Sequence, residues 1–166
     1  MFHDHPHGRP ADPVWQALSQ TDDMHVVHLW RSNLLHVVLS ETLAERSDHW
    51  VQRADQAERN PEPEKPLVLD PQKLGKQFAS MTRMRQLRRR QLVHLPAIDI
   101  EFEDLRHDRE RTFARLCRFL ELPEQAARPW TVRQRQRPAH ELIENYRELE
   151  IYFSNTPWAE FFAEGR

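Results

Sequence analysis

Arg31 and Ser40 are the residues whose types and spacing best suit the binding of a phosphate group. Arg31 follows the apolar run Met24–Leu29, and Ser40 lies nine positions later in a segment of helical periodicity. A guanidinium can hold a phosphate through two parallel hydrogen bonds, and the first N–H groups of a helix add donors and partial positive charge. Ser40 lies about 10 Å along the expected helix, so both residues reach one phosphate only if it rests against the helix side. An ordinary surface ion pair explains a strand-end arginine nearly as well.

Three glycines are present in the chain, at Gly8, Gly75 and Gly165. A glycine-rich phosphate cradle needs glycine directly after a strand and at the opening of a helix. None of the three lies in such a place, so the sequence does not predict a glycine-rich phosphate loop.

Histidines are concentrated at the start of the chain, where His3, His5 and His7 alternate with other residues. Histidine at i and i+2 is not a standard helical ligand pair, and no later cluster completes a set of four ligands. We therefore predict no metal site. His25 and His28 lie in the apolar run and are interpreted as hydrogen-bonded core residues.

Arginines crowd the end of a helix that is predicted to run from Asp70-Pro71 to about Leu92. A basic stripe of this kind is typical of nucleic-acid-binding proteins. Arginine at a helix C-terminus also interacts favourably with the helix dipole, and few aromatic residues lie among these arginines. The formal net charge is −2. We therefore predict no nucleic-acid partner. An arginine-rich nucleic-acid binder is kept as the less favoured alternative hypothesis. The arginines are Arg83, Arg85, Arg88, Arg89 and Arg90.

The elements that must position these residues are two strands among five or six helices. The strands are predicted at Met24–Leu29 and Ala97–Phe102 because both are short, apolar or alternating runs. Strands separated by helices favour an α/β fold with parallel strands. Two strands make a poor sheet, so the fold looks incomplete. The predicted helices begin at Asp12-Pro13, at Asn33 (Leu34–Arg46), at Asp70-Pro71, at Asp108 (Arg109–Glu121), at Pro138 and at Thr156-Pro157.

Residues 47–69 are predicted to form a long exposed loop, because three prolines fall within six residues. Trp50 in this loop is either a pin that holds the loop to the core or a platform for a substrate. Such a loop is a usual place for specificity.

The length of 166 residues suits one domain, residues 1–166, with a real core. Cys117, the single cysteine, is predicted to be a small core residue, which excludes a disulfide framework. No run approaches about 20 apolar residues, and no apolar signal region opens the chain. We expect a soluble cytoplasmic protein without a membrane span.

Four segments, in the correct order, resemble the sulfotransferases that use 3′-phosphoadenosine 5′-phosphosulfate (PAPS). HVVHLWRSNLLHVVLSETLAERSDHW is similar to the family's 3′-phosphate-binding strand and helix, and IDIEFEDL resembles its Tyr-Glu-Asp-Leu strand end, with Phe102 in the tyrosine place. RTFARLCRFLELP resembles the helix that follows. VRQRQRPAHELIENYRELEIYFSNTPWAEFF resembles the tail of the bacterial carbohydrate enzymes of the nodulation-factor type. The likeness covers roughly residues 20–163.

The resemblance implies transfer of a sulfuryl group from PAPS to a hydroxyl of a carbohydrate or small-molecule acceptor, with no metal. Arg31 and Ser40 would bind the 3′-phosphate of PAPS, and Arg133, Gln134 and Arg135 correspond to the family's late basic loop. A solvated polar loop explains these three residues equally well. Arg31 and Ser40 are nine residues apart, whereas the cytosolic members usually have eight, and Ser32 occupies that position.

The resemblance also implies that the family's N-terminal strand–loop–helix of the P-loop kind, which holds the 5′-phosphosulfate, is missing from these residues. The chain corresponds to the C-terminal two-thirds of the family, as a partial P-loop-type sulfotransferase fold. Phe2–His5 resembles sequence that precedes the 3′-phosphate strand, and His5 is the one candidate for the general base. An inactive remnant or binding module of the same fold is the second hypothesis. A homo-oligomer or a partner chain that completes the sheet stays open.

Overall fold

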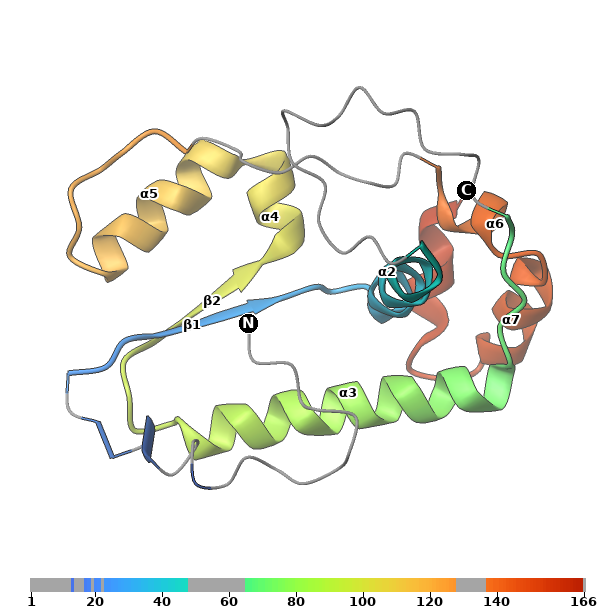
Figure 1. Cartoon of the computed structure of the whole chain (residues 1–166), viewed down its shortest axis with the longest axis horizontal. Helices are drawn as coiled ribbons and strands as arrows, with labels where there is room; N and C mark the ends of the chain where they lie inside the picture. The colour runs from blue at the N-terminus through green and yellow to red at the C-terminus, as the bar shows by residue number, and fades with distance from the viewer. Residues whose placement is uncertain are drawn as a thin grey trace. The chain divides into compact units, whose positions relative to one another are not determined.

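The computed structural model describes residues 13, 17–18, 20–21, 23–47, 65–127 and 137–165. These residues form a mixed α/β structure with six helices, a 3-10 helix and one two-stranded parallel sheet (Figure 1). This confirms the predicted α/β class and the parallel strands. The element bounds are β1 Val26–Trp30, α2 Leu34–Ser47, α3 Pro71–Gln91, β2 Ala97–Glu101, α4 Phe102–His107, α5 Arg109–Phe119, α6 Ala139–Leu142, α7 Tyr146–Phe153 and η2 Ala159–Gly165.

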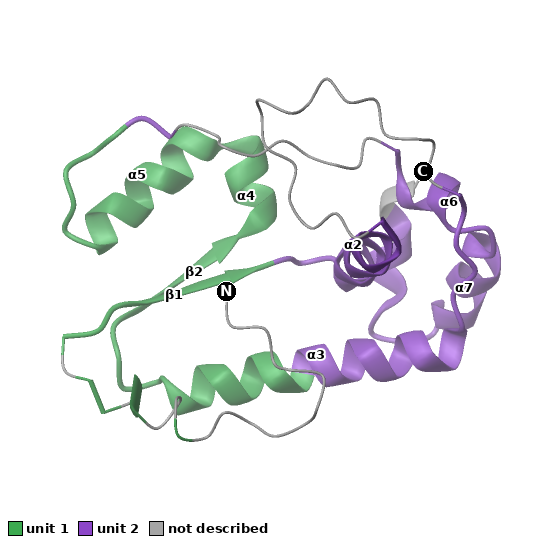
Figure 2. Cartoon of the chain, in the orientation of Figure 1, with its two compact units in different colours: residues 1–30, 83–125 green, residues 31–82, 126–166 purple. Residues whose placement is uncertain are grey.

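The chain divides into two compact units (Figure 2). Unit 1 comprises Met1–Trp30 and Arg83–Gln125, and unit 2 comprises Arg31–Thr82 and Ala126–Arg166. Each unit is therefore assembled from two stretches of chain that lie far apart in the sequence.

Unit 1 is built on the parallel pair β1 and β2, in which His28 lies opposite Asp99 at the centre of each strand. Figure 1 shows α4 and α5 on one side of this sheet and the last turns of α3 on the other. The side chains of β1 alternate, with His28 partly buried on one face and Val27 and Leu29 exposed on the other. The polar residues of the sheet thus face the arginine-rich end of α3.

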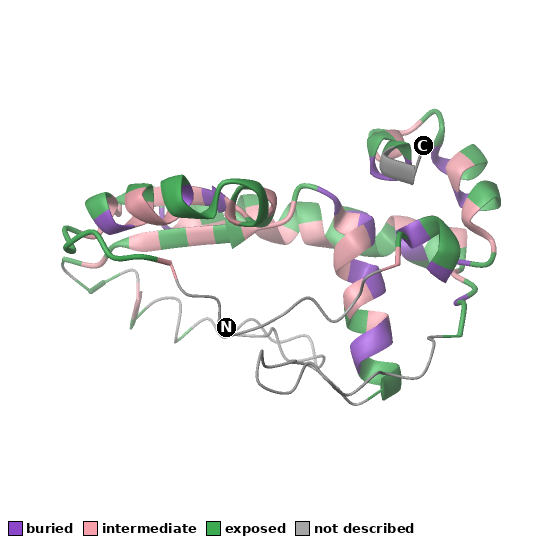
Figure 3. Ribbon diagram, turned by 90° about the horizontal axis from the view of Figure 1, so that it is seen from above, coloured by how far each residue is buried: buried purple, intermediate pink, exposed green. Residues whose placement is uncertain are grey.

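Unit 2 contains the main apolar core. The side of α2 that was predicted to face inward is buried, at Leu35, Val38, Leu39 and Leu43 (Figure 3). These residues belong to one cluster with the aromatic side chains of α3, α7 and η2, which include Phe78, Phe153 and Phe162. The 3.6-residue period of the apolar positions therefore predicted the buried side of α2 correctly.

A short ladder joins the segment before α3 to the segment between α6 and α7. Leu67 forms a parallel bridge with Ile143, and its backbone bonds to Leu142 and Glu144. The side chain of Asn145 extends this ladder, because its amide donates to the Leu69 carbonyl at 2.8 Å and accepts the Leu69 N–H at 3.0 Å. The sequence predicts a single helix after Pro138, and this prediction is wrong. The chain leaves the helix at Ile143 because that residue forms the bridge with Leu67.

Two other sequence predictions need correction. Phe102 does not end the second strand but begins α4, whose acidic first turn and basic last turn suit the helix dipole. Asp108 precedes α5 but its side chain makes no cap hydrogen bond, and its carboxylate lies 3.8 Å from Arg111 instead. Trp50 and most of the proline-containing loop lie outside the described residues.

Candidate phosphate-binding site

Arg31 and Ser40 lie together in unit 2. Nη1 of Arg31 donates to Oγ of Ser40 at 3.2 Å and approaches the carbonyl oxygen of His36 at 3.5 Å. His36 and Ser40 are four residues apart on α2, so they occupy one row along the helix surface. The arginine side chain therefore turns back along the side of α2, which is the arrangement that a shared phosphate requires.

Asn33 fixes the start of this helix. Its Oδ1 accepts the N–H of His36 at 3.3 Å, which confirms the predicted N-cap. Its Nδ2 donates to the carbonyl of Phe161 at 2.9 Å, and the residue is 4% exposed. One buried side chain thus holds the first turn of α2 against η2, and Arg31 lies two residues before it. Sequence reasoning found the cap but not the Phe161 contact, which joins residues 128 positions apart.

The hydrogen bond between Arg31 and Ser40 has a fixed direction, because a guanidinium can only donate. Ser40 must accept, and its hydroxyl makes no other hydrogen bond with the residues that the structure describes. The proton of Ser40 is consequently left to donate to an incoming group. A permanent cation and a hydroxyl donor at 3.2 Å form a donor set for an anionic oxygen. Both side chains are half-buried, so an anion bound there would be partly shielded from water.

The other residues predicted for the site are not part of the described structure. Arg133, Gln134 and Arg135 lie in the range 128–136, and His5 lies in the range 1–12, both outside the described residues. His3 and His7 lie in the same N-terminal range. The site as described therefore consists of Arg31, Ser40 and the first turns of α2.

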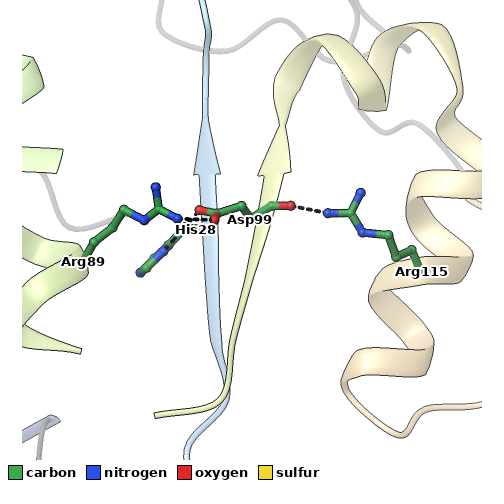
Figure 4. Close-up of polar contacts among 4 residues, drawn as sticks. All are labelled: His28, Arg89, Asp99 and Arg115. Carbon is green, nitrogen blue, oxygen red and sulfur yellow. Dashed lines mark hydrogen bonds and ion pairs between the residues drawn. The ribbon is translucent and has the colours of Figure 1, made fainter. Parts of the chain in front are cut away.

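A second polar cluster lies in unit 1, around Asp99 (Figure 4). Oδ2 of Asp99 is 2.7 Å from Nη2 of Arg89, and Oδ1 is 3.4 Å from Nδ1 of His28. Arg115 donates to the backbone carbonyl of Asp99 from α5. Oδ1 of Asp99 and Nε2 of His28 are buried without a hydrogen bond to any described residue. The 3.4 Å approach between Nδ1 of His28 and Oδ1 of Asp99 is therefore close but not aligned as a hydrogen bond. The prediction that His28 is a hydrogen-bonded core residue is wrong, because its Nε2 has no partner among the described residues and its side chain is 21% exposed.

His25, the other strand histidine of the prediction, is also not a core residue. It precedes β1, is exposed, and its ring contacts Phe119 edge to face at 5.3 Å. The sequence could have suggested the neighbouring His28–Asp99 pair only through strand register, since each residue is the central one of its strand.

Several arginines at the end of α3 are engaged within unit 1. The guanidinium of Arg85 stacks on the ring of Trp30, with Cζ 3.2 Å from the ring centroid. Burial lowers the pKa of Arg85, and the nearby charge of Arg89 lowers it further, against the opposing effect of Asp99. Arg88 donates to Gln91. These guanidinium groups make contacts within unit 1, so fewer of the arginines at the end of α3 are available to bind nucleic acid.

No known protein family, no curated protein and no solved structure matches the chain. Among the described residues, no helix is long and apolar enough to cross a membrane. Within the same residues, no group of three His, Cys, Asp or Glu side chains could hold a metal ion.

Proposed function

We propose that the chain is a PAPS-dependent sulfotransferase of the bacterial carbohydrate type, in which Arg31 and Ser40 bind the 3′-phosphate of the nucleotide. The observation that carries this proposal is the 3.2 Å contact between Arg31 and Ser40, made along the side of α2. The sequence predicts that the two residues share one phosphate, and their contact supports that prediction.

The donor set of this site suits a terminal phosphate. A phosphate oxygen is a better acceptor for a guanidinium than a neutral hydroxyl is, because both partners of the hydrogen bond are then charged. Such an oxygen can replace the Ser40 hydroxyl as the acceptor of Arg31 and at the same time accept the proton of Ser40. Nη1 of Arg31 and Oγ of Ser40 would both donate to the 3′-phosphate and so orient the adenosine end.

When bound, PAPS supplies the sulfuryl group that passes to a hydroxyl of a carbohydrate or small-molecule acceptor. The described residues of this chain contribute the selective recognition of the 3′-phosphate. The family likeness that suggests the reaction covers the strand end, the EDL segment and the tail, so it rests on more of the chain than the Arg31 site alone.

The direct test is calorimetric titration with 3′-phosphoadenosine 5′-phosphate and with 5′-AMP, which differ only by the 3′-phosphate. We expect tighter binding of the first nucleotide. Arg31→Ala and Ser40→Ala should each reduce that preference by about tenfold or more, because a hydrogen bond to an ionised group is worth about 1.5–3 kcal/mol.

Matched controls lie on the same helix. Arg46 and Ser47 are an exposed arginine and an exposed serine near the end of α2, and Arg46→Ala and Ser47→Ala should leave the preference unchanged. Equal affinity for the two nucleotides, or full retention of the preference in Arg31→Ala, would disprove the site.

The two other hypotheses give different results in the same set of experiments. A binding module of the same fold would prefer the 3′-phosphorylated nucleotide but transfer no sulfuryl group to any carbohydrate hydroxyl. A nucleic-acid binder would bind DNA with an affinity that falls steeply with salt. Arg83→Ala would weaken that DNA binding, whereas Arg31→Ala would leave it unchanged.

A further inference from the structure

Three buried polar atoms of unit 1 have no hydrogen-bond partner among the residues that the structure describes. They are Nε2 of His28, Nε1 of Trp30 and Oδ1 of Asp99. Buried polar atoms in proteins are almost always hydrogen-bonded, so each exception calls for an explanation, such as a functional role or a bound water. Three exceptions on two neighbouring strands point to a common cause.

The three atoms belong to side chains on one face of the sheet. Successive side chains of a strand alternate between the two faces, so His28 and Trp30, two residues apart on β1, share a face. Asp99 is the register partner of His28 on β2 and lies on that face too. Figure 4 shows His28 and the Asp99 carboxylate turned toward Arg89 of α3. The three unpartnered atoms therefore form one cluster beside the arginine-rich end of α3.

The charged groups around this cluster balance each other. The guanidinium of Arg85 lies over the Trp30 ring, with Cζ 3.2 Å from the ring centroid. Arg89 pairs with Oδ2 of Asp99 at 2.7 Å. Burial and then the charge of Arg89 lower the pKa of Arg85. The charges of Asp99 and Glu101 oppose that lowering, so both carboxylates lie close enough to act on the guanidinium. Two cations and two carboxylates share the face, and their formal charges cancel.

The hydrogen-bonding capacities of the three atoms select the chemistry of a ligand. The indole N–H of Trp30 can only donate, Oδ1 of Asp99 can only accept, and Nε2 of His28 does either according to its protonation. A hydroxyl both donates and accepts through one oxygen, so it satisfies such a mixed set. An anion would meet the carboxylate of Asp99, and a cation would meet two guanidinium groups. The set therefore favours a neutral ligand with several hydroxyls.

We propose that this face of unit 1 binds a neutral carbohydrate through its hydroxyls. The indole of Trp30 donates to a hydroxyl oxygen, while Asp99 and His28 accept hydroxyl protons. The identification of this sugar as the acceptor of the sulfuryl group rests on the proposed function, whereas the binding itself does not. None of these residues belongs to the phosphate site.

The cluster borders solvent although its three unpartnered atoms are buried. The side chains of His28 and Asp99 are 21% and 39% exposed, and that of Arg89 is 52% exposed. Arg85 and Arg89 contact the cluster through long side chains that have many rotamers. A sugar hydroxyl reaches the three atoms by rotation of these two side chains, without movement of the strands.

The test follows the indole N–H of Trp30 by two-dimensional proton–nitrogen NMR of the full chain. The signal is assigned by its loss in Trp30→Phe. The probes are D-glucose, D-galactose and D-mannose, each titrated separately. We expect at least one of these sugars to shift the Trp30 signal saturably while the other indole signals stay in place. If no neutral sugar gives a saturable shift, water alone satisfies the cluster and the proposal is overturned.

Charged analogues test the class of ligand with the unmodified chain, so this comparison does not depend on the folding of a variant. For the sugar that binds, the corresponding uronate and amino sugar keep the ring but carry a negative and a positive charge. Both should bind at least about tenfold more weakly, because a charge of either sign meets a like charge at this face. Equal or tighter binding of either analogue would overturn the assignment to a neutral ligand.

Variants of the accepting residues test the assigned contacts. His28→Leu removes Nε2, and Asp99→Asn removes the carboxylate charge. Each should weaken sugar binding by about fivefold or more, because a hydrogen bond is lost or weakened. The matched control is Asp108→Asn, at an exposed aspartate of the same unit, which should bind the sugar as the unmodified chain does. Unchanged affinity in both His28→Leu and Asp99→Asn would contradict the site.

These measurements use no nucleotide, so their failure is distinguishable from failure of the proposed function. A sugar that shifts the Trp30 signal, together with equal binding of 3′-phosphoadenosine 5′-phosphate and 5′-AMP, would support the carbohydrate site and disprove the phosphate site. A clear preference for the 3′-phosphorylated nucleotide, together with no effect of any neutral sugar on Trp30, would support the phosphate site and overturn this inference.

Discussion

The side chain of Arg31 runs back along α2 until its Nη1 lies 3.2 Å from Oγ of Ser40, although the two residues are nine positions apart in the sequence. The contact joins a residue that precedes the helix to one in its second turn. It converts two separate sequence candidates into one donor set, and the chemistry of that set depends on the shape of the guanidinium as well as on its charge.

Replacing Arg31 with lysine should therefore be disruptive even though the charge is kept. A lysine ammonium is a point charge without the planar fork of donors that matches a phosphate. We expect Arg31→Lys to lower the affinity for 3′-phosphoadenosine 5′-phosphate by about tenfold, measured by calorimetry, with little change for 5′-AMP. Arg46→Lys on the same helix should change neither value. Unchanged affinity in Arg31→Lys would mean that charge alone accounts for binding.

Asn33 should contribute more to the free energy of unfolding than a surface cap does, because it makes one buried hydrogen bond besides its half-buried cap bond. Asn33→Ala removes the cap on His36 and the bond to Phe161, and we expect a loss of about 2–3 kcal/mol in urea unfolding. Asn33→Ser keeps a cap acceptor but cannot reach Phe161. Its loss should be smaller by about 1 kcal/mol, the usual worth of a cap. Equal losses in the two variants would show that the cap contributes nothing here.

The sequence predicted those parts of the fold that depend on local signals. Asn33 and Asp70 are caps in the structure as expected, since Asp70 accepts the N–H of Lys73 at 2.8 Å. Thr156 likewise accepts the N–H of Trp158, although the element that follows is a 3-10 helix. Cys117 is buried as predicted.

Features that depend on pairing between distant segments were not predicted. The break between α6 and α7 is set by Leu67, which pairs with Ile143 across 76 positions of sequence. The alternating pattern that made Phe102 look like a strand residue is also compatible with the first turn of α4, and only the chain's departure from β1 after Trp30 ends the ladder there. In the candidate site, the residue types alone indicated that the ligand is a phosphate group. The direction in which the Arg31 side chain runs could be read only from the structure.

Asn145 offers a test of the ladder between Leu67–Leu69 and the α6–α7 junction. Its side-chain amide both donates to and accepts from the backbone of Leu69. In Asn145→Asp the carboxylate can accept the Leu69 N–H but cannot donate to the Leu69 carbonyl, so two acceptors would face each other. We expect a loss of about 1–3 kcal/mol in the free energy of unfolding at neutral pH.

The matched control for that substitution is Asn155→Asp, at an exposed turn position in the same unit. It should change stability by no more than about 0.5 kcal/mol. If both substitutions have the same small effect, the Asn145 amide is not important for the ladder.

Gly75 lies in the interior of α3 and should be replaceable by alanine with a gain in stability. A Cβ added there would lie 3.5 Å from Phe153 and 3.6 Å from Trp158, which are ordinary van der Waals distances. Alanine restricts the unfolded chain and fits a helix better than glycine, by about 0.5–1 kcal/mol. We expect Gly75→Ala to raise Tm by roughly 2–4 °C, measured by circular dichroism. Gly75→Val should lower Tm instead, because its branched carbons must enter the space already filled by Phe153 and Trp158. A lower Tm for Gly75→Ala would mean that the two rings pack against α3 too tightly to accept even one methyl group.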